Sequence, residues 1–169
     1  MADMKIGAYI CGGCGISERL DVKQLTTTAT RDGKAAIGKS HDFLCSAEGV
    51  NLIQADIDNE GVNRVVIVGC SRRAKTEAFN FENVTLHRAN IREGVIWVRP
   101  DTEEAQETTQ EMAEDYVRMG CAEIKFMSVP KPSEEQGTNR HVMVVGGCIT
   151  GMTAALEAAR AGYQVSIVD

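Results

Sequence analysis

Two apolar runs that each end in cysteine constrain the fold of this chain more than any other feature. Residues 64–68 form an almost continuous β-branched run followed by Gly69-Cys70-Ser71, and the run at 5–10 is followed by the glycine-rich segment 11–15. The run at 64–68 predicts a strand that is buried on both faces, as in a parallel sheet, and the run at 5–10 predicts a strand that leads into a tight loop. The sequence therefore places thiols at the carboxyl ends of two strands.

Helical patterns alternate with these strands. Asp21 is a capping residue for a helix that starts near Val22, and Ser46 caps one that continues to about residue 59, where Gly61 stops it. Further elements expected in this half are a weaker strand at 84–87 and a helix from 101 or 102 to about 119, with 89–98 left unassigned.

A second α/β pattern follows a polar segment at 129–139, which contains two of the three prolines and has no hydrophobic period. After it come a strand at 141–145, a turn at 146–151, an alanine-rich helix at 152–161 and a strand at 163–168. Strands that alternate with helices on both sides of the polar segment indicate an α/β protein with parallel sheets. We expect a cysteine-rich α/β domain at 1–128, a linker at 129–139, and at 140–169 the first βαβ of a Rossmann unit that is truncated before it is complete.

Charge and hydropathy argue against two classes of function. The net charge is −6 and basic and acidic residues are mixed along the chain, so no basic stripe predicts binding to nucleic acid. No apolar run approaches the roughly 20 residues that span a bilayer, and residues 1–5 lack the features of a secretory signal. We therefore expect a cytoplasmic protein with no direct membrane insertion.

Six cysteines in a reducing compartment indicate metal ligation or redox chemistry rather than structural disulfides. Cys11 and Cys14 form a C-x-x-C pair among glycines, which lets two thiolates converge on one metal. Cys45 and Cys70 each follow an apolar run. Because the carboxyl ends of parallel strands lie on one edge of a sheet, the strand-end thiols can gather there, with Cys45 on a neighbouring loop. Four thiolates match the ligand count of a 4Fe–4S cluster.

The same cysteines fit two other interpretations. Four of them can hold a zinc ion that stabilises a domain for docking partner subunits, and the C-x-x-C pair can act as a redox dithiol. Cys121 begins an apolar stretch after a glycine and is expected to be a small buried hydrophobe. Two arginines, Arg72 and Arg73, follow the last of the four cysteines and are candidates for balancing the charge of an anionic cluster.

One turn near the C-terminus carries the features of a dinucleotide-binding fingerprint. Gly146, Gly147 and Gly151 lie between a strand and a helix, and Asp169 follows at the end of the next strand. In that context the glycines allow a tight turn, the helix N-terminus binds a pyrophosphate and the acid binds a ribose hydroxyl. Cys148 occupies the place of the second fingerprint glycine, so it is either a tolerated small side chain or a reserve ligand for the N-terminal metal site.

With these residues in view, the chain resembles, over nearly its whole length, the N-terminal region of the HdrA component of heterodisulfide reductase and its bacterial relatives, including the HdrA-like flavoprotein of the quinone-interacting oxidoreductase of sulfate reducers. The segments that carry the resemblance are Ile10-Cys11 leading to Cys14-Gly15, Phe43-Leu44-Cys45-Ser46, Gly69-Cys70-Ser71-Arg72-Arg73, Ala89-Asn90-Ile91-Arg92-Glu93 with Trp97, and the turn from Gly146 to Gly151. The chain departs in having C-x-x-C-G where archaeal members resemble C-x-C-G, and Val95 where they resemble I-R-E-x-C-x-W. These departures leave Cys148 and Cys121 as reserves for the fourth ligand.

The resemblance implies a small domain with a 4Fe–4S cluster that precedes a thioredoxin-reductase-like FAD domain. It also implies electron transfer within a multisubunit complex of the heterodisulfide reductase or quinone-interacting oxidoreductase kind. The expected cluster ligands are Cys11, Cys14, Cys45 and Cys70. On this interpretation the chain is an electron-transfer module that is not itself catalytic, and FAD is expected in the full-length protein rather than in this fragment.

Overall fold

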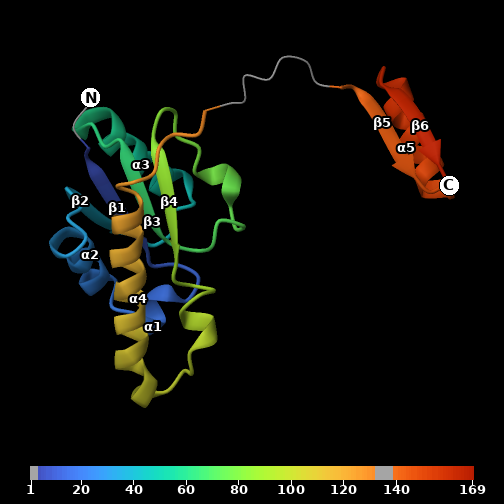
Figure 1. Cartoon of the computed structure of the whole chain (residues 1–169). Coiled ribbons are helices and arrows are strands. Elements are labelled where there is room, and N and C mark those ends of the chain that lie inside the picture. The colour runs from blue at the N-terminus through green and yellow to red at the C-terminus, as the bar shows by residue number, and fades with distance from the viewer. Residues whose placement is uncertain (1–3, 132–138) are drawn as a thin grey trace. The chain divides into compact units, whose positions relative to one another are not determined.

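The computed structural model describes residues 4–131 and 139–169 (Figure 1). These residues divide into two compact units, one that ends at Pro130 and one that starts at Lys131. The first contains a four-stranded parallel sheet with several helices and the second a two-stranded parallel sheet with one helix, so the predicted α/β class is confirmed. Residues 132–138, which make up most of the predicted linker, lie outside the described residues.

Two strands form the middle of the first sheet and are almost completely buried. β1 (Ile6–Cys11) and β3 (Arg64–Gly69) pair in parallel, as their continuous apolar runs predict. They are flanked by β2 (Ile37–His41) and β4 (Thr85–Asn90), in the order β2-β1-β3-β4. No sequence pattern predicts β2, because this edge strand is only partly buried and mixes polar with apolar residues.

Capping residues set where the first long helices begin and end. Asp21 caps α2 (Val22–Arg31) by accepting two backbone N–H groups, Ser46 caps α3 (Ala47–Glu60), and Gly61 ends α3 in a left-handed conformation with φ of 69°. These positions confirm the predicted helix boundaries. The shorter helices of this unit are α1 (Ile16–Arg19) and the 3₁₀ turns η1 (Thr76–Ala78) and η2 (Ile96–Val98).

The helix α4 (Glu103–Glu123) continues past Gly120, where the sequence predicts its end. A Cβ atom at Gly120 would lie 3.1 Å from the His87 ring and 3.3 Å from the Cβ atom of Ala89, both on β4. Gly120 therefore allows α4 to pack closely on the sheet, and does not terminate the helix. None of the described helices, of which α4 is the longest, combines the length and apolar character that a membrane crossing needs.

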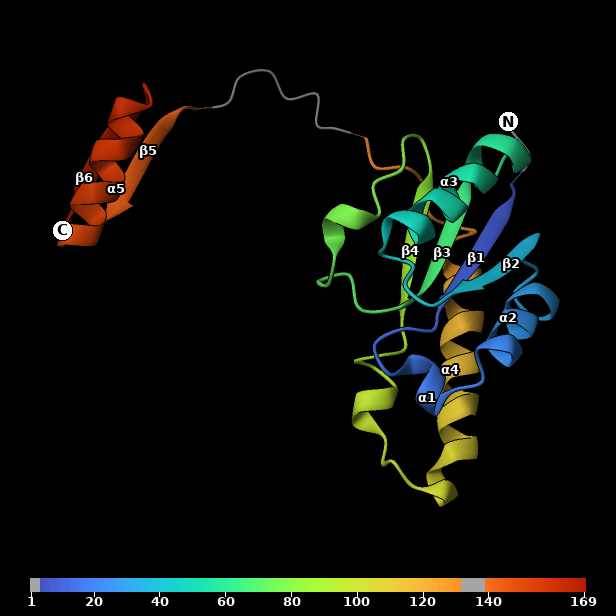
Figure 2. The same cartoon turned by 180° about the vertical axis from the view of Figure 1, so that it is seen from behind.

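The order in which strands join the first sheet reverses between β1 and β3. After β1 the chain forms β2 on one side, and then crosses back to form β3 and β4 on the other side. Figures 1 and 2 show α2 and α4 on one face of the sheet and α3 on the other. In doubly wound sheets the connections diverge at such a reversal, which leaves a crevice at the carboxyl ends of the two central strands where ligands bind.

The second unit is a single βαβ. It consists of β5 (His141–Val145), α5 (Ile149–Arg160) and β6 (Gln164–Val168), and the two strands pair in parallel. α5 begins at Ile149, earlier than the start predicted at 152, because Cys148 is its N-cap and Gly151 lies within its first turn.

A buried carboxylate connects three elements of the first unit. Asp56 on α3 is 5% exposed, and it accepts the Tyr9 hydroxyl at 3.1 Å and the Lys39 ammonium at 2.6 Å. Tyr9 on β1 is fully buried, and this burial, together with the neighbouring carboxylate, raises the pKa of its phenol. A buried carboxylate is tolerated only while it is paired and hydrogen-bonded, so this contact fixes α3 to β1 and β2.

Substituting Asp56→Ala is expected to lower the free energy of unfolding by about 2–3 kcal/mol, because it leaves the Tyr9 hydroxyl buried without an acceptor. Tyr9→Phe is expected to cost about 1 kcal/mol. Asp58 is exposed on the same helix, so Asp58→Ala is the matched control and should change stability by less than about 0.5 kcal/mol. Urea unfolding followed by circular dichroism measures all three; equal losses for the two aspartate variants would contradict the structural role of Asp56.

Candidate metal centre

Two of the predicted cysteine ligands lie at the crevice where the strand order reverses. Cys11 is the last residue of β1, and Cys70 directly follows β3. A Cβ atom at Gly69 would lie 3.1 Å from the Cβ atom of Cys11, so the strand ends are close together there. Cys11 and Cys14 are among the groups near Cys70 that, after burial, raise the pKa of its thiol. The parallel sheet therefore gathers the strand-end thiols as the sequence predicts.

The C-x-x-C loop packs against the segment that leads to Cys45. A Cβ atom at Gly13 would overlap the carbonyl oxygen of Asp42 and lie 2.5 Å from the Phe43 ring, so only glycine fits there. Cys14 adopts a left-handed conformation with φ of 55°, uncommon for residues other than glycine, and its side chain is exposed. This packing brings the C-x-x-C loop next to the loop that carries Cys45.

Cys45 directly precedes the N-cap of α3. The Ser46 hydroxyl accepts the backbone N–H of Gly49 at 3.1 Å and donates to the carbonyl of Phe43 at 2.7 Å. A Cβ atom at Gly49 would lie 2.5 Å from the Cα atom of Leu44, so the loop folds closely over the first turn of the helix. The N-terminus of a helix carries partial positive charge, which favours an anionic group beside Cys45.

Three of the predicted ligands line one cavity. Its lining includes Cys11, Cys45, Cys70, Phe79 and Arg88, and its volume is about 20 Å³, room for about one water molecule. The fourth predicted ligand, Cys14, does not line it. Within the described residues no three Cys, His, Asp or Glu side chains stand in a metal-binding arrangement, and the cysteines are all free thiols. The residue types fit a thiolate-bound metal, but their side chains would have to rearrange to hold one, and a group larger than a single ion requires the loops to move apart.

An ion pair holds the backbone just after Cys70. One Glu93 oxygen accepts the backbone N–H of Ser71 at 2.9 Å, and the other accepts the Arg92 guanidinium at 2.9 Å. The Asn90 side chain accepts the backbone N–H of Glu93 and fixes the turn. Burial by itself raises the pKa of Glu93, but the hydrogen bonds from Arg92 and Ser71 outweigh it and hold the pKa below its ordinary value.

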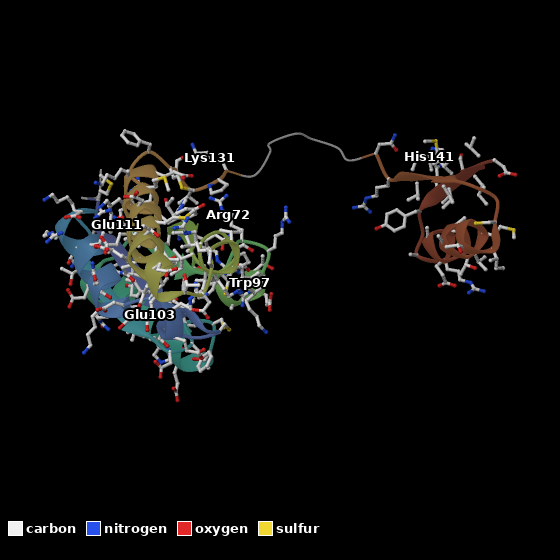
Figure 3. The ribbon with its side chains drawn as sticks, turned by 90° about the horizontal axis from the view of Figure 1, so that it is seen from below. Arg72, Trp97, Glu103, Glu111, Lys131 and His141 are labelled. Carbon is white, nitrogen blue, oxygen red and sulfur yellow. The ribbon has the colours of Figure 1, made fainter. Side chains whose placement is uncertain are left out.

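Arg92 brings a positive charge to the cysteine site. Burial raises the pKa of the Cys70 thiol, and Arg92 is the main group that opposes this rise. Although burial lowers the pKa of Arg92, the hydrogen bond to Glu93 and the nearby Cys70 sulfur raise it above its ordinary value. The guanidinium carbon also lies 4.9 Å from the ring centre of Trp97, which is 67% exposed on the surface of the first unit (Figure 3). The site therefore holds a cation close to the sulfur atoms, where it would stabilise negative charge on them.

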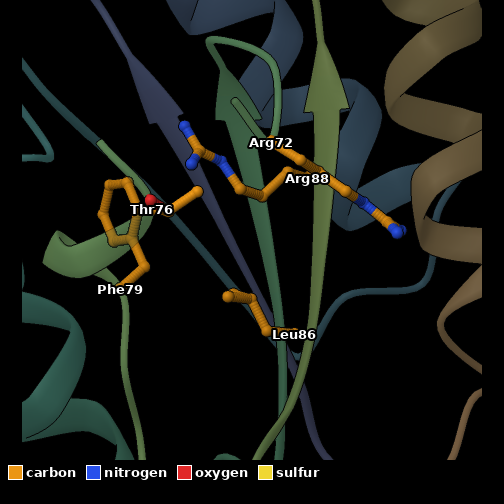
Figure 4. Close-up of a pocket in the computed structure, with 5 residues that line it drawn as sticks. All are labelled: Arg72, Thr76, Phe79, Leu86 and Arg88. Atoms are coloured by element: carbon orange, nitrogen blue, oxygen red, sulfur yellow. The ribbon is translucent and has the colours of Figure 1, made fainter. Parts of the chain in front are cut away.

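A second pocket, of about 230 Å³, shares a wall with the cysteine cavity (Figure 4). It is lined by Arg72, Thr76, Phe79, Leu86 and Arg88. Arg88 extends towards Phe79, whose ring centre is 4.9 Å from the guanidinium carbon, and Arg72 extends in the opposite direction. Arg72 and Arg73 are both exposed and do not line the cysteine cavity. The arginines that the structure places against the cysteines are thus Arg88 and Arg92, and not the pair named from the sequence.

Of the two reserve cysteines, Cys121 does not line this cavity and Cys148 belongs to the second unit. Cys121 on α4 is fully buried against Gly33, and burial raises the pKa of its thiol to about 11, so it is a core residue as expected. Cys148 belongs to the second unit and is exposed at the N-cap of α5. The backbone N–H groups of Gly151 and Thr150 lower the pKa of its thiol. Its role as a reserve ligand stays a prediction.

The turn of the second unit has the geometry of the predicted fingerprint. Gly146 has a φ of 105°, which favours glycine, and a Cβ atom at Gly151 would overlap the carbonyl oxygen of Gly146. The backbone N–H of Gly147 donates to a carboxylate oxygen of Asp169 at 3.1 Å. The acid at the end of β6 therefore lies beside the turn before α5, although binding of a nucleotide by these residues stays a prediction.

Known proteins similar to this chain are components of redox enzymes. No family model matches the chain. The HdrA component of the ferredoxin:CoB-CoM heterodisulfide reductase of Methanosarcina mazei is 33% identical over 174 residues, which is 98% of this chain and 21% of that protein. The HdrA component of the H(2):CoB-CoM heterodisulfide,ferredoxin reductase of Methanothermobacter marburgensis is 33% identical over all of this chain and 26% of its own length. An iron-sulfur HdrA component of the CoB–CoM heterodisulfide reductase of Methanopyrus kandleri is 33% identical over 98% of this chain and 26% of its own length.

These matches cover both units, and each of the three relatives is named as the A subunit of a heterodisulfide reductase. Over nearly its whole length the chain is similar to the HdrA components of heterodisulfide reductases, and it spans between a fifth and about a quarter of the length of these relatives.

Substituting Glu93→Gln in the metal-free protein is expected to lower the free energy of unfolding by about 1 kcal/mol at pH 7, because the charged acceptor of Ser71 and Arg92 is lost. A carboxyl whose folded pKa is depressed stabilises the protein above its ordinary pKa and loses that contribution as pH falls through the folded value. The difference between wild type and variant should therefore shrink from pH 6 to pH 3 in denaturant titrations. Exposed Glu82→Gln is the control and should show no such dependence.

Proposed function

We propose that the chain is the electron-transfer module of an iron–sulfur flavoprotein of the heterodisulfide reductase kind. In this proposal a 4Fe–4S cluster is held by Cys11, Cys14, Cys45 and Cys70. The observation that carries the proposal is the cavity at the sheet edge, where cysteines from three separate segments converge beside the strand-order reversal. Four thiolates are the usual ligand set of such a cluster, and the neighbouring arginines suit its negative charge.

The chain's own residues supply the ligands and control their surroundings. Gly13 allows the two cysteine loops to pack together, and Gly49 allows the Cys45 loop to fold over the start of α3. The Glu93–Arg92 pair holds the backbone next to Cys70. The apolar side chains of the cavity, such as Phe79, limit the access of water. When bound, the cluster supplies one-electron chemistry and exchanges electrons with an FAD in the full-length protein.

In the same proposal, the second unit begins the FAD-binding domain. We propose domain boundaries at 1–128 and 140–169 with a linker between them, and the division of the chain at Pro130 supports this. The N-terminus of α5 would face the pyrophosphate, Gly146, Gly147 and Gly151 would allow its close approach, and Asp169 would bind a ribose hydroxyl.

The relatives' names indicate the setting in which such a module works. They refer to CoB-CoM heterodisulfide and, in two cases, to ferredoxin. We therefore propose that the full-length protein works with other subunits in a complex of the heterodisulfide reductase or quinone-interacting oxidoreductase kind.

Anaerobic iron and sulfide analysis tests the ligand set. Serine variants of Cys11, Cys14, Cys45 and Cys70 are each expected to lose most of the bound iron, because serine is a poor ligand for a cluster of this kind. Cys121→Ala is the control and should keep wild-type iron, since Cys121 is buried away from the cavity. If any of the four serine variants retains full iron, that residue is not a ligand and Cys148 becomes the next candidate, tested by Cys148→Ser.

A zinc-stabilised docking domain is the second candidate function, because the cavity in its present form has room for a single ion rather than a cluster. Visible absorption near about 400 nm that bleaches with dithionite is expected for the iron–sulfur protein, whereas zinc bound by thiolates is colourless there. A colourless protein that binds one zinc per chain would favour the docking domain. Thiol titration before and after reduction identifies the remaining alternative, a redox disulfide between Cys11 and Cys14.

A further inference from the structure

Arg88 is a buried cation whose surroundings, in the part of the chain that the structure describes, leave part of its charge and one of its hydrogen-bond donors without a partner. It lies on β4, is 8% exposed, and donates to the Ala74 carbonyl at 2.6 Å. Its Nε atom is buried and has no hydrogen-bond partner among the described residues. The Phe79 ring offers a cation–π contact, which is weaker than an ion pair with an anion. A guanidinium keeps its charge in proteins, so its burial calls for a nearby negative group.

The side chains around Arg88 include predicted metal ligands. Arg88 lines the cysteine cavity together with Cys45 and Cys70. Figure 4 shows the Arg88 side chain extending towards Phe79, which lines the same cavity.

The other cations near the cysteine cavity differ from Arg88 in exposure. Lys75 also lines the cavity, but it is exposed to solvent, as are Arg72 and Arg73. Arg92 does not line the cavity and is already paired with Glu93. Solvent and salt screen the charges of exposed groups, whereas a buried charge acts at close to full strength over the same distance. Among the cavity-lining cations, Arg88 is therefore the one with the strongest effect on a charge inside.

We propose that Arg88 is the buried counter-cation of the cysteine site, and that it raises the reduction potential of the metal group held by Cys45 and Cys70. This inference rests on the proposed function. A 4Fe–4S cluster with four thiolates is anionic, and it gains one further negative charge when a reductant such as dithionite transfers one electron to it. Arg88 therefore stabilises the reduced form more than the oxidised form. Arg88 acts here as a positioning residue that tunes potential and does not ligate the metal.

The test compares Arg88→Gln, Arg88→Lys and the exposed control Arg73→Gln in the full chain, each reconstituted with iron and sulfide without oxygen. Dithionite titration, followed by visible absorption and electron paramagnetic resonance, gives the midpoint potential at low and high salt. We expect Arg88→Gln to shift the potential to more negative values at both salt concentrations, and Arg88→Lys to restore it towards wild type. Arg73→Gln should leave it unchanged.

Each outcome decides for or against the role of Arg88. If Arg88→Gln loses the cluster while Arg88→Lys keeps it at a near wild-type potential, the requirement for a positive charge is upheld. An Arg88→Gln potential equal to that of wild type overturns the inference, and so does loss of the cluster from both Arg88 variants while Arg73→Gln keeps it, since Arg88 would then serve the fold alone. If wild type itself binds no cluster under these conditions, the proposed function fails and the inference falls with it.

Discussion

β1 and β3 pair in parallel from Ile6 with Arg64 to Ile10 with Val68, and both strands are buried along almost their whole length. Buried backbone N–H and C=O groups need partners in the sheet, and a slip of one residue would turn every side chain to the opposite face, so this register is strongly fixed. The register ends with Cys11 next to Gly69, one residue before Cys70. The cavity, and the loops and charges around it, depend on this alignment.

Two buried charges in the first unit are stabilised in different ways. Asp56 is paired with Lys39 and accepts the Tyr9 hydroxyl, so its charge and its hydrogen bonds are satisfied within the fold. Arg88 has one carbonyl acceptor and an aromatic ring but leaves Nε without a partner among the described residues. A buried polar group that is only partly satisfied is costly, and such groups tend to lie where the protein binds something. The contrast supports the proposal that the cysteine edge, and not the Asp56 contact, is the functional part of the sheet.

The structure also shows how the separate segments by which the chain resembles the HdrA family are related to one another in space. The segments 69–73 and 89–93 are separated by a loop and a strand, yet Glu93 accepts the backbone N–H of Ser71. Their joint presence therefore reflects one contact that holds the backbone beside Cys70. The Phe43 to Ser46 segment is linked in the same way to the C-x-x-C loop, because Gly13 packs directly against Asp42 and Phe43. Motifs that are far apart in the chain thus form a single edge of the sheet.

The sequence by itself determined the features that depend on neighbouring residues: the buried strands β1 and β3, the caps Asp21 and Ser46, and the α/β class. These follow from backbone propensity, side-chain periodicity and local hydrogen bonds, which act over a few residues. Only the tertiary structure decided that residues 37–41 form the edge strand β2 and that α4 continues through Gly120. It also decided that the cations beside the cysteines are Arg88 and Arg92 rather than Arg72 and Arg73. Each of these depends on which surface meets which across the sheet, and that is set by packing between segments far apart in the chain.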